Sequence, residues 1–112
     1  MSNQPDVLEL TRKLGREPNL KAALLITQWE LGDLAKSTVY ADWHPTDAHL
    51  YKLEAKHALG SLLFQAEVIA QLLDTTSAEA FAFGVETIKD RIIDKERKLG
   101  RFINYEGDQR DE

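Results

Sequence analysis

Three prolines and one polar break divide this chain into four helix-length segments, and this division limits what it can fold into. The prolines are Pro5, Pro18 and Pro45, and the polar break covers residues 74–77. Proline cannot continue a helix, because it lacks a backbone N–H and clashes with the preceding turn. Between these points, apolar residues recur at helical spacing and do not alternate as they would in a strand. The pattern therefore predicts an all-α protein.

The ends of the predicted helices follow from capping residues and breaks. Asn19 and Ser77 are suitable N-caps, and Gly100 is a suitable C-terminal stop. The predicted helices cover residues 6–16, 20–41, 46–73 and 77–99. We expect one all-α domain over residues 1–103, followed by a polar, mobile tail over residues 104–112.

The predicted third helix is long for a chain of 112 residues. At about 1.5 Å per residue, residues 46–73 would span about 42 Å, whereas a compact domain of this size has a radius of gyration near 13 Å. Its apolar arc is also too broad for one partner helix to cover. We therefore expect long helices of two or more copies to share a bundle, in a homodimer or a higher homo-oligomer. The alternative is a kinked third helix in a monomeric bundle.

Charge and composition exclude several classes of protein. The net charge of −5 argues against general binding to nucleic acid or to anionic membranes, because both need a positive surface. Disulfides and thiolate metal sites are excluded, since there is no cysteine. No apolar run approaches the roughly 20 residues of a membrane span, and the polar residues 1–6 lack the core of a secretion signal. We expect a cytoplasmic protein.

Two carboxylates lie on the predicted apolar face of the second helix. Glu30 shares a ridge with Ile26 and Leu34, and Asp33 lies one turn further on. Two like charges about 6 Å apart repel by roughly 3 kcal/mol at an effective dielectric constant of 20. A bound cation is the simplest compensation. The alternatives are a basic residue from another helix or a hydrated seam between subunits.

Two short motifs resemble those of a known enzyme family. Residues 29–35 read WELGDLA, and residues 58–64 read ALGSLLF. In this order they resemble the two acidic motifs of the MazG-like all-α nucleoside triphosphate pyrophosphohydrolases, and the resemblance covers residues 19–91. It implies a four-helix protomer in which acids of both motifs hold Mg²⁺ against the phosphates of a nucleotide.

The second motif departs from the family pattern at both of its acids. Where the family has Glu and Asp, this chain has Ala58 and Ser61, which are poor ligands for a hard cation. Glu54 lies one turn before Ala58 on the same side of the predicted helix. We therefore expect a reduced metal site of Glu30, Asp33 and Glu54, with Mg²⁺ as the ion and Mn²⁺ as a substitute. A solvated rim or an intersubunit ion pair is the alternative role for Glu54.

Three further residues are candidates for contact with a nucleotide substrate. The family resemblance implies phosphate contacts from Lys and Asn in the middle of the fourth helix, where residues 85–88 here read VETI, and Lys89 and Arg91 follow as partial substitutes. Trp29 precedes the first acid and offers a ring for stacking. Each has a structural alternative. The two basic residues are spaced for ion pairs along their own helix, and the tryptophan suits core or interface packing.

The resemblance implies hydrolysis of a nucleoside triphosphate to a monophosphate and pyrophosphate. The loss of two acids gives weight to an alternative, a catalytically inactive relative that acts as a nucleotide-binding or protein-interaction module. A third alternative is a structural helical oligomer whose acids bind nothing.

Overall fold

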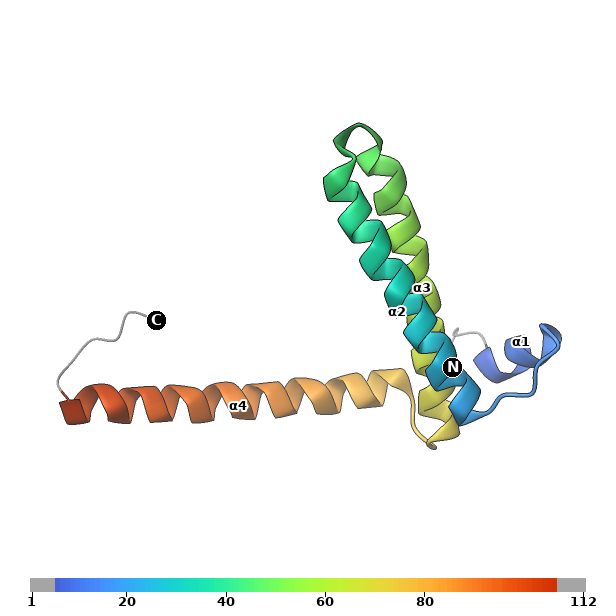
Figure 1. Cartoon of the computed structure of the whole chain (residues 1–112). Helices are drawn as coiled ribbons and strands as arrows, with labels where there is room; N and C mark the ends of the chain where they lie inside the picture. Colours follow the sequence, from blue (N-terminus) through green and yellow to red (C-terminus); the bar gives the residue numbers. More distant parts are fainter. Residues whose placement is uncertain (1–5, 107–112) are drawn as a thin grey trace. The chain divides into compact units, whose positions relative to one another are not determined.

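The computed structural model describes residues 6–106, with side chains described for residues 6–100. Over this range the chain is helical, without a strand, so the predicted all-α class is confirmed. The elements are α1 (Val7–Lys13), α2 (Leu20–Trp43), the short 3-10 helix η1 (Pro45–Asp47), α3 (Ala48–Leu72) and α4 (Ser77–Glu106) (Figure 1).

The predicted end of the fourth helix is wrong. Helix α4 passes through Gly100 and continues to Glu106. A glycine ends a helix when it takes a left-handed conformation, and the described glycine with positive φ is Gly15. At Gly100 the residue only weakens the helix by about 1 kcal/mol relative to alanine. Residues 107–112 of the predicted tail lie outside the described residues.

Helix α1 is shorter than predicted because a left-handed turn closes it. Gly15 has a φ of 91° and follows the helix end at Lys13 by two residues. Its backbone N–H donates to the carbonyl of Arg12 (2.9 Å), and the N–H of Arg16 donates to the carbonyl of Thr11 (3.3 Å). These two bonds form a Schellman motif, which satisfies the last carbonyls of the helix.

Helices α2 and α3 form an antiparallel hairpin joined by η1, and they lie side by side over much of their length (Figure 1). The start of α2 is as predicted, since the Asn19 side chain accepts a hydrogen bond from the N–H of Ala22 at 2.8 Å. The predicted start of the third helix at residue 46 is replaced by η1, with Pro45 in its first turn. Proline is tolerated there because its missing N–H would have no partner in a first turn.

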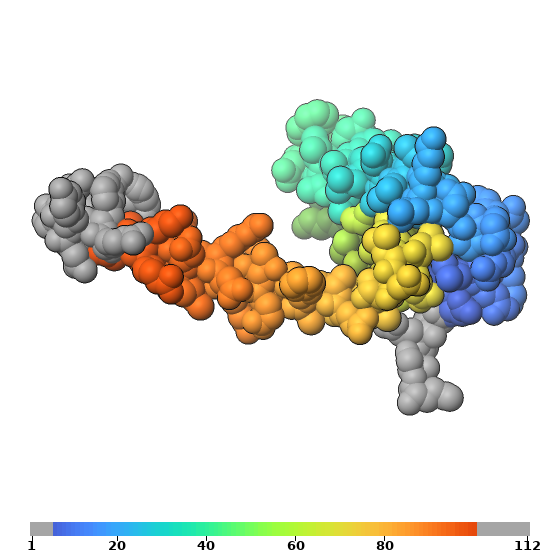
Figure 2. Space-filling view, turned by 90° about the horizontal axis from the view of Figure 1, so that it is seen from below, coloured from blue at the N-terminus to red at the C-terminus, as the bar shows by residue number. Residues whose placement is uncertain are grey.

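The apolar core lies where α1 packs against α3, at the end of the hairpin opposite η1. Figure 2 shows the blue atoms of α1 beside the yellow atoms at the end of α3. Its central members are Val7, Ala23 and Val68, of which Val68 is the most enclosed at 2% exposure. The side chains packed around them are Leu8, Phe64, Ile69 and Leu72. This core is small, and many large apolar side chains of α2 and α3 remain exposed.

Contacts divide the chain into two units, which we describe separately. Over the described residues the first unit covers 6–77 and holds α1, α2, η1 and α3, and the second covers 78–106 of α4. The single domain over residues 1–103 stays a prediction, as does the packing of long helices in a homo-oligomeric bundle.

Near the end of α3, a buried carboxylate ties the helix to the turn that follows it. Glu67 is 8% exposed and accepts hydrogen bonds from the backbone N–H of Ser77 and from the side-chain amide of Gln71, both at 2.8 Å. The Ser77 hydroxyl and the Gln71 amide, helped by the Ser77 N–H, lower the pKa of Glu67 below its ordinary value of 4.5. The carboxylate thereby holds in place the turn after α3, in which Asp74 has a φ of 63°.

Glu67 should make stability depend on pH in the acid range. Because its pKa is lower in the folded chain, the stabilisation is complete above pH 4.5 and is lost as the pH falls through the folded-state pKa. Glu67→Gln should therefore cost about 1–2 kcal/mol in urea unfolding at pH 7 and much less at pH 3. Asp42→Asn, at an exposed acid of α2 with no ion pair among the described residues, is the matched control. Equal losses at the two pH values for Glu67→Gln would contradict this role.

Candidate functional site

Acidic residues of α2 and α3 meet along one face of the hairpin. Glu30 and Asp33 come from α2, and Glu54 comes from α3. All three line one cavity of about 370 Å³, which we call the acid cavity. Its lining residues are Glu30, Asp33, Lys36, Ser37, Glu54, His57, Ala58 and Ser61. The hairpin thus places the three acids of the predicted metal site around one space.

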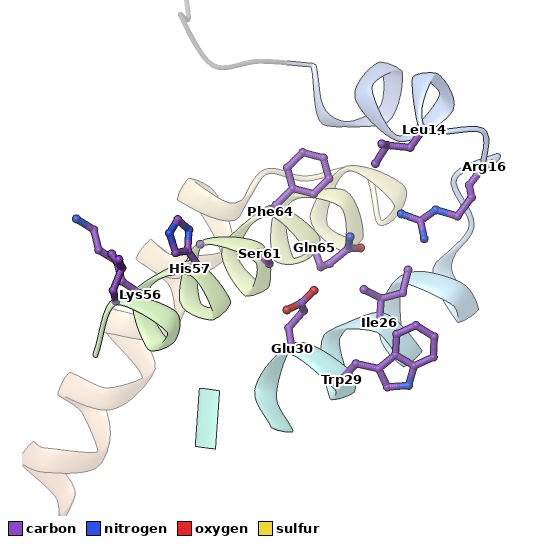
Figure 3. Close-up of a pocket in the computed structure, with 12 residues that line it drawn as sticks. Leu14, Arg16, Ile26, Trp29, Glu30, Lys56, His57, Ser61, Phe64 and Gln65 are labelled. Carbon is purple, nitrogen blue, oxygen red and sulfur yellow. The ribbon is translucent and has the colours of Figure 1, made fainter. Parts of the chain in front are cut away.

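A larger cavity of about 740 Å³ adjoins the acid cavity and shares Glu30, His57 and Ser61 with it. Figure 3 shows the Glu30 carboxylate directed from α2 toward Ser61 and Gln65 of α3. The other lining residues are Leu14, Arg16, Ile26, Trp29, Leu53, Lys56, Gly60, Phe64 and Gln65. The carboxylate of Glu30 therefore lies at the junction of an acidic space and a largely apolar one.

The two central acids are less buried than the sequence pattern indicates. Glu30 is half-buried and Asp33 is exposed. Helix α3 covers only one side of α2, and Asp33 lies beside that contact on the side that opens into the acid cavity. Solvation therefore offsets much of the cost of the two charges, and a cation is not required to keep them there.

The predicted acids do not form a ready-made ligand cluster. Among the described residues, no group of three or more Asp, Glu, His or Cys side chains is close enough to hold a metal ion together. The donor chemistry nevertheless suits a hard cation, since carboxylate oxygens line the cavity on both helices. Mg²⁺ commonly uses one or two protein carboxylates and takes its remaining ligands from phosphates and water. The residues fit one such ion and do not fit a cage for several.

Sequence reasoning missed the basic residues around these cavities. Lys36 is exposed and lines the acid cavity with Asp33, one turn away. Arg16 and Lys56 line the larger cavity. Figure 3 shows the Arg16 guanidinium pointing into that space from the segment between α1 and α2. In the sequence these residues are recognisable only as basic residues near a helix start or at helical spacing from the acids. Such residues are too common to indicate a site.

The predicted substrate residues fall in different units. Trp29 lines the larger cavity and is 67% exposed, so it does not pack in the core of its own unit. Lys89 and Arg91 belong to α4, which is described separately from the cavities. The Lys89 ammonium lies 3.6 Å from the carboxylate of Glu86 on the same helix, as expected from their spacing. The phosphate role of Lys89 and Arg91 stays a prediction.

Comparisons with known proteins do not assign this chain to a family. A scan against protein-family models, a search of curated proteins and a search of solved structures each return no match. The resemblance to MazG-like pyrophosphohydrolases thus depends on the two motifs and their order alone. Within residues 6–106, no helix is both long and apolar enough to cross a membrane.

Proposed function

We propose that this chain binds a nucleoside triphosphate with Mg²⁺ in the two adjoining cavities and hydrolyses it to a nucleoside monophosphate and pyrophosphate. The observation that supports the proposal is the shared cavity of Glu30, Asp33 and Glu54 beside a larger space. The two volumes, about 370 and 740 Å³, lie in the range of small-molecule sites. Mn²⁺ is the expected substitute for Mg²⁺.

The charge of the acid cavity supports a divalent cation as part of the ligand. Its three carboxylates and the Lys36 ammonium leave a formal charge of −2, counting His57 as neutral. A phosphate chain alone would be repelled from such a space, whereas a phosphate chain carrying Mg²⁺ would be neutralised within it. The ammonium of Lys36, which lies 5.9 Å from the centre of the Tyr40 ring, would pair with a phosphate oxygen at the same cavity.

In this proposal the three acids and the ring of Trp29 each have a part in positioning the substrate. Glu30 and Asp33 hold the cation end of the nucleotide, and Glu54 approaches it from α3. The exposed ring of Trp29 offers a surface for stacking of the base in the larger cavity. Mg²⁺ held by these acids would neutralise phosphate charge and lower the pKa of a bound water.

A second function, nucleotide binding without turnover, is favoured by the residues facing the acids. Ala58 lines the acid cavity at 7% exposure, and Ser61 lines it without a charge. Without acids at these two positions, where the family that the chain resembles has Glu and Asp, the cavity would hold the phosphates less rigidly, and catalysis depends on rigid placement. Binding as such needs less, since one or two carboxylates suffice for Mg²⁺.

The predicted homo-oligomer belongs to this proposal as well. Leu24 and Leu31 are exposed and seven residues apart, so they form one stripe of α2. Leu59 and Leu63 of α3 are also exposed. None of these four leucines lines the two cavities. A second copy covering them would leave the candidate site open to its substrate.

Pyrophosphate release from a panel of NTPs and dNTPs tests the proposal. We expect the full-length chain to release pyrophosphate from at least one of them with Mg²⁺ or Mn²⁺, and none in EDTA. In parallel, a non-hydrolysable triphosphate analogue should raise the melting temperature only when Mg²⁺ is present. A melting shift without turnover would favour the binding module. Neither turnover nor a shift would refute both functions.

A further inference from the structure

Helix α4 carries an apolar stripe that neither proposed function uses. Phe81, Ile88, Ile92 and Leu99 are exposed, by 45% to 74%, and Val85 is half-buried. In chain order these residues are Phe81, Val85, Ile88, Ile92 and Leu99, separated by four, three, four and seven residues. Lys95 divides the last interval into three and four. We call the residues at these six positions the α4 seam.

The spacing of the seam is that of a coiled coil. Intervals that alternate between four and three residues average 3.5, which keeps a narrow stripe facing one partner helix when the two helices supercoil. In heptad terms, Val85, Ile92 and Leu99 take a positions, and Phe81, Ile88 and Lys95 take d positions. Among the large exposed apolar side chains described for α4, Phe83 and Ile93 lie outside the seam. A partner helix with the same repeat would match the seam best, and a second copy of α4 supplies one.

Charges beside the seam favour a parallel pair. Arg91 takes a g position and Glu96 the e position five residues later. In a parallel in-register pair, g and e positions with this separation face each other. Arg91 of each copy would therefore meet Glu96 of the other, giving two attractive contacts. Neither residue forms an ion pair with another described side chain, so both are available.

An antiparallel pair has no such electrostatic advantage. With Ile88 of one copy opposite Leu99 of the other, Lys89 would meet Glu96, but Arg91 would meet Lys98. The attraction and the repulsion cancel. Acids are also interspersed with the basic residues along α4, which disfavours an anionic membrane as the partner. Over residues 77–100 these acids are Glu79, Glu86, Asp90, Asp94 and Glu96.

We propose that α4 forms a parallel two-stranded coiled coil with α4 of a second copy of this chain. This interface is separate from the exposed leucines of α2 and α3, and the two surfaces together would give a higher homo-oligomer. Lys95 at a d position would face its counterpart in this alignment and weakens the pair, as polar residues in coiled-coil cores do. This proposal does not depend on the proposed function.

Disulfide trapping in the full-length chain tests the alignment, because the chain has no cysteine of its own. Ile88→Cys and Leu99→Cys each place a thiol in the seam. In a parallel in-register pair each cysteine faces its own counterpart, so each variant alone should form a disulfide-linked dimer with oxidised glutathione. Asp90→Cys, half a turn away from the seam, is the matched control and should remain monomeric on a non-reducing gel.

Other patterns of cross-linking would overturn the proposal. A disulfide formed only when Ile88→Cys and Leu99→Cys are mixed would indicate an antiparallel pair. No cross-linking in either variant, with a monomeric wild type in sedimentation equilibrium, would indicate that the seam is covered by its own chain or by another protein.

Charge reversal provides a second test that leaves the apolar seam intact. Arg91→Glu and Glu96→Arg should each weaken dimerisation by about fivefold in sedimentation equilibrium, whereas the double variant should return to about the wild-type dissociation constant. Arg97→Glu lies opposite the seam and should have no effect. A double variant no stronger than the single ones would refute the Arg91–Glu96 contact and, with it, the parallel alignment.

Discussion

Replacing Glu30 with glutamine is expected to lower Mg²⁺-dependent pyrophosphate release by about 100-fold, the rate equivalent of ~3 kcal/mol. Glu30 lines both cavities, and its carboxylate is directed into the space between α2 and α3 (Figure 3). Glutamine has nearly the same shape but no charge, so the cation would lose one of its two acids on α2. The rise in melting temperature caused by Mg²⁺ and the triphosphate analogue should disappear as well.

The comparison needs a control on the same helix. Asp42→Asn removes an exposed acid of α2 that lines neither cavity, and it should keep the wild-type rate. Because Glu30 is only half-buried and forms no ion pair among the described residues, Glu30→Gln should fold normally, as circular dichroism can check. A Glu30→Gln variant that is as active as Asp42→Asn would remove the acid cavity from the mechanism.

Restoring two acids on α3 is expected to have the opposite effect. The double variant Ala58→Glu, Ser61→Asp places carboxylates at two positions that already line the acid cavity. It should bind Mg²⁺ more tightly and release pyrophosphate at least ~10-fold faster, because more ligands fix the cation and the phosphates in place. Without metal, the added like charges should instead lower the melting temperature, since Ala58 is buried.

The sign of this metal effect distinguishes ligation from a general change in stability. In EDTA the double variant should melt below the wild type, and added Mg²⁺ should recover most of the difference. The matched control, Ala58→Gln with Ser61→Asn, has similar volume without charge and should not respond to Mg²⁺. If the acidic and the amide variants respond alike, the cavity does not hold a cation at these positions.

The parts of the fold that depend on neighbouring residues could be predicted from the sequence. Asn19 is the N-cap of α2 as expected, because the cap involves only the N–H three residues later. The all-α class followed from the spacing of apolar residues for the same reason. The end of α4 could not be predicted in this way, since Gly100 ends a helix only if its backbone turns left-handed. In the turn after α1 the left-handed residue is Gly15, and in the turn after α3 it is Asp74.

The same distinction between local and long-range contacts applies to the candidate site. The sequence by itself determined that Glu30 and Asp33 lie one turn apart on α2, because helical geometry alone places them. Only the tertiary structure decided that Glu54, His57 and Lys36 line the same cavity and that Asp33 is exposed. It also decided that Glu67 of α3 binds the backbone of Ser77. These outcomes depend on which segments distant in the sequence come together, and on how completely they cover each other, and the spacing of residues along one helix does not contain that information.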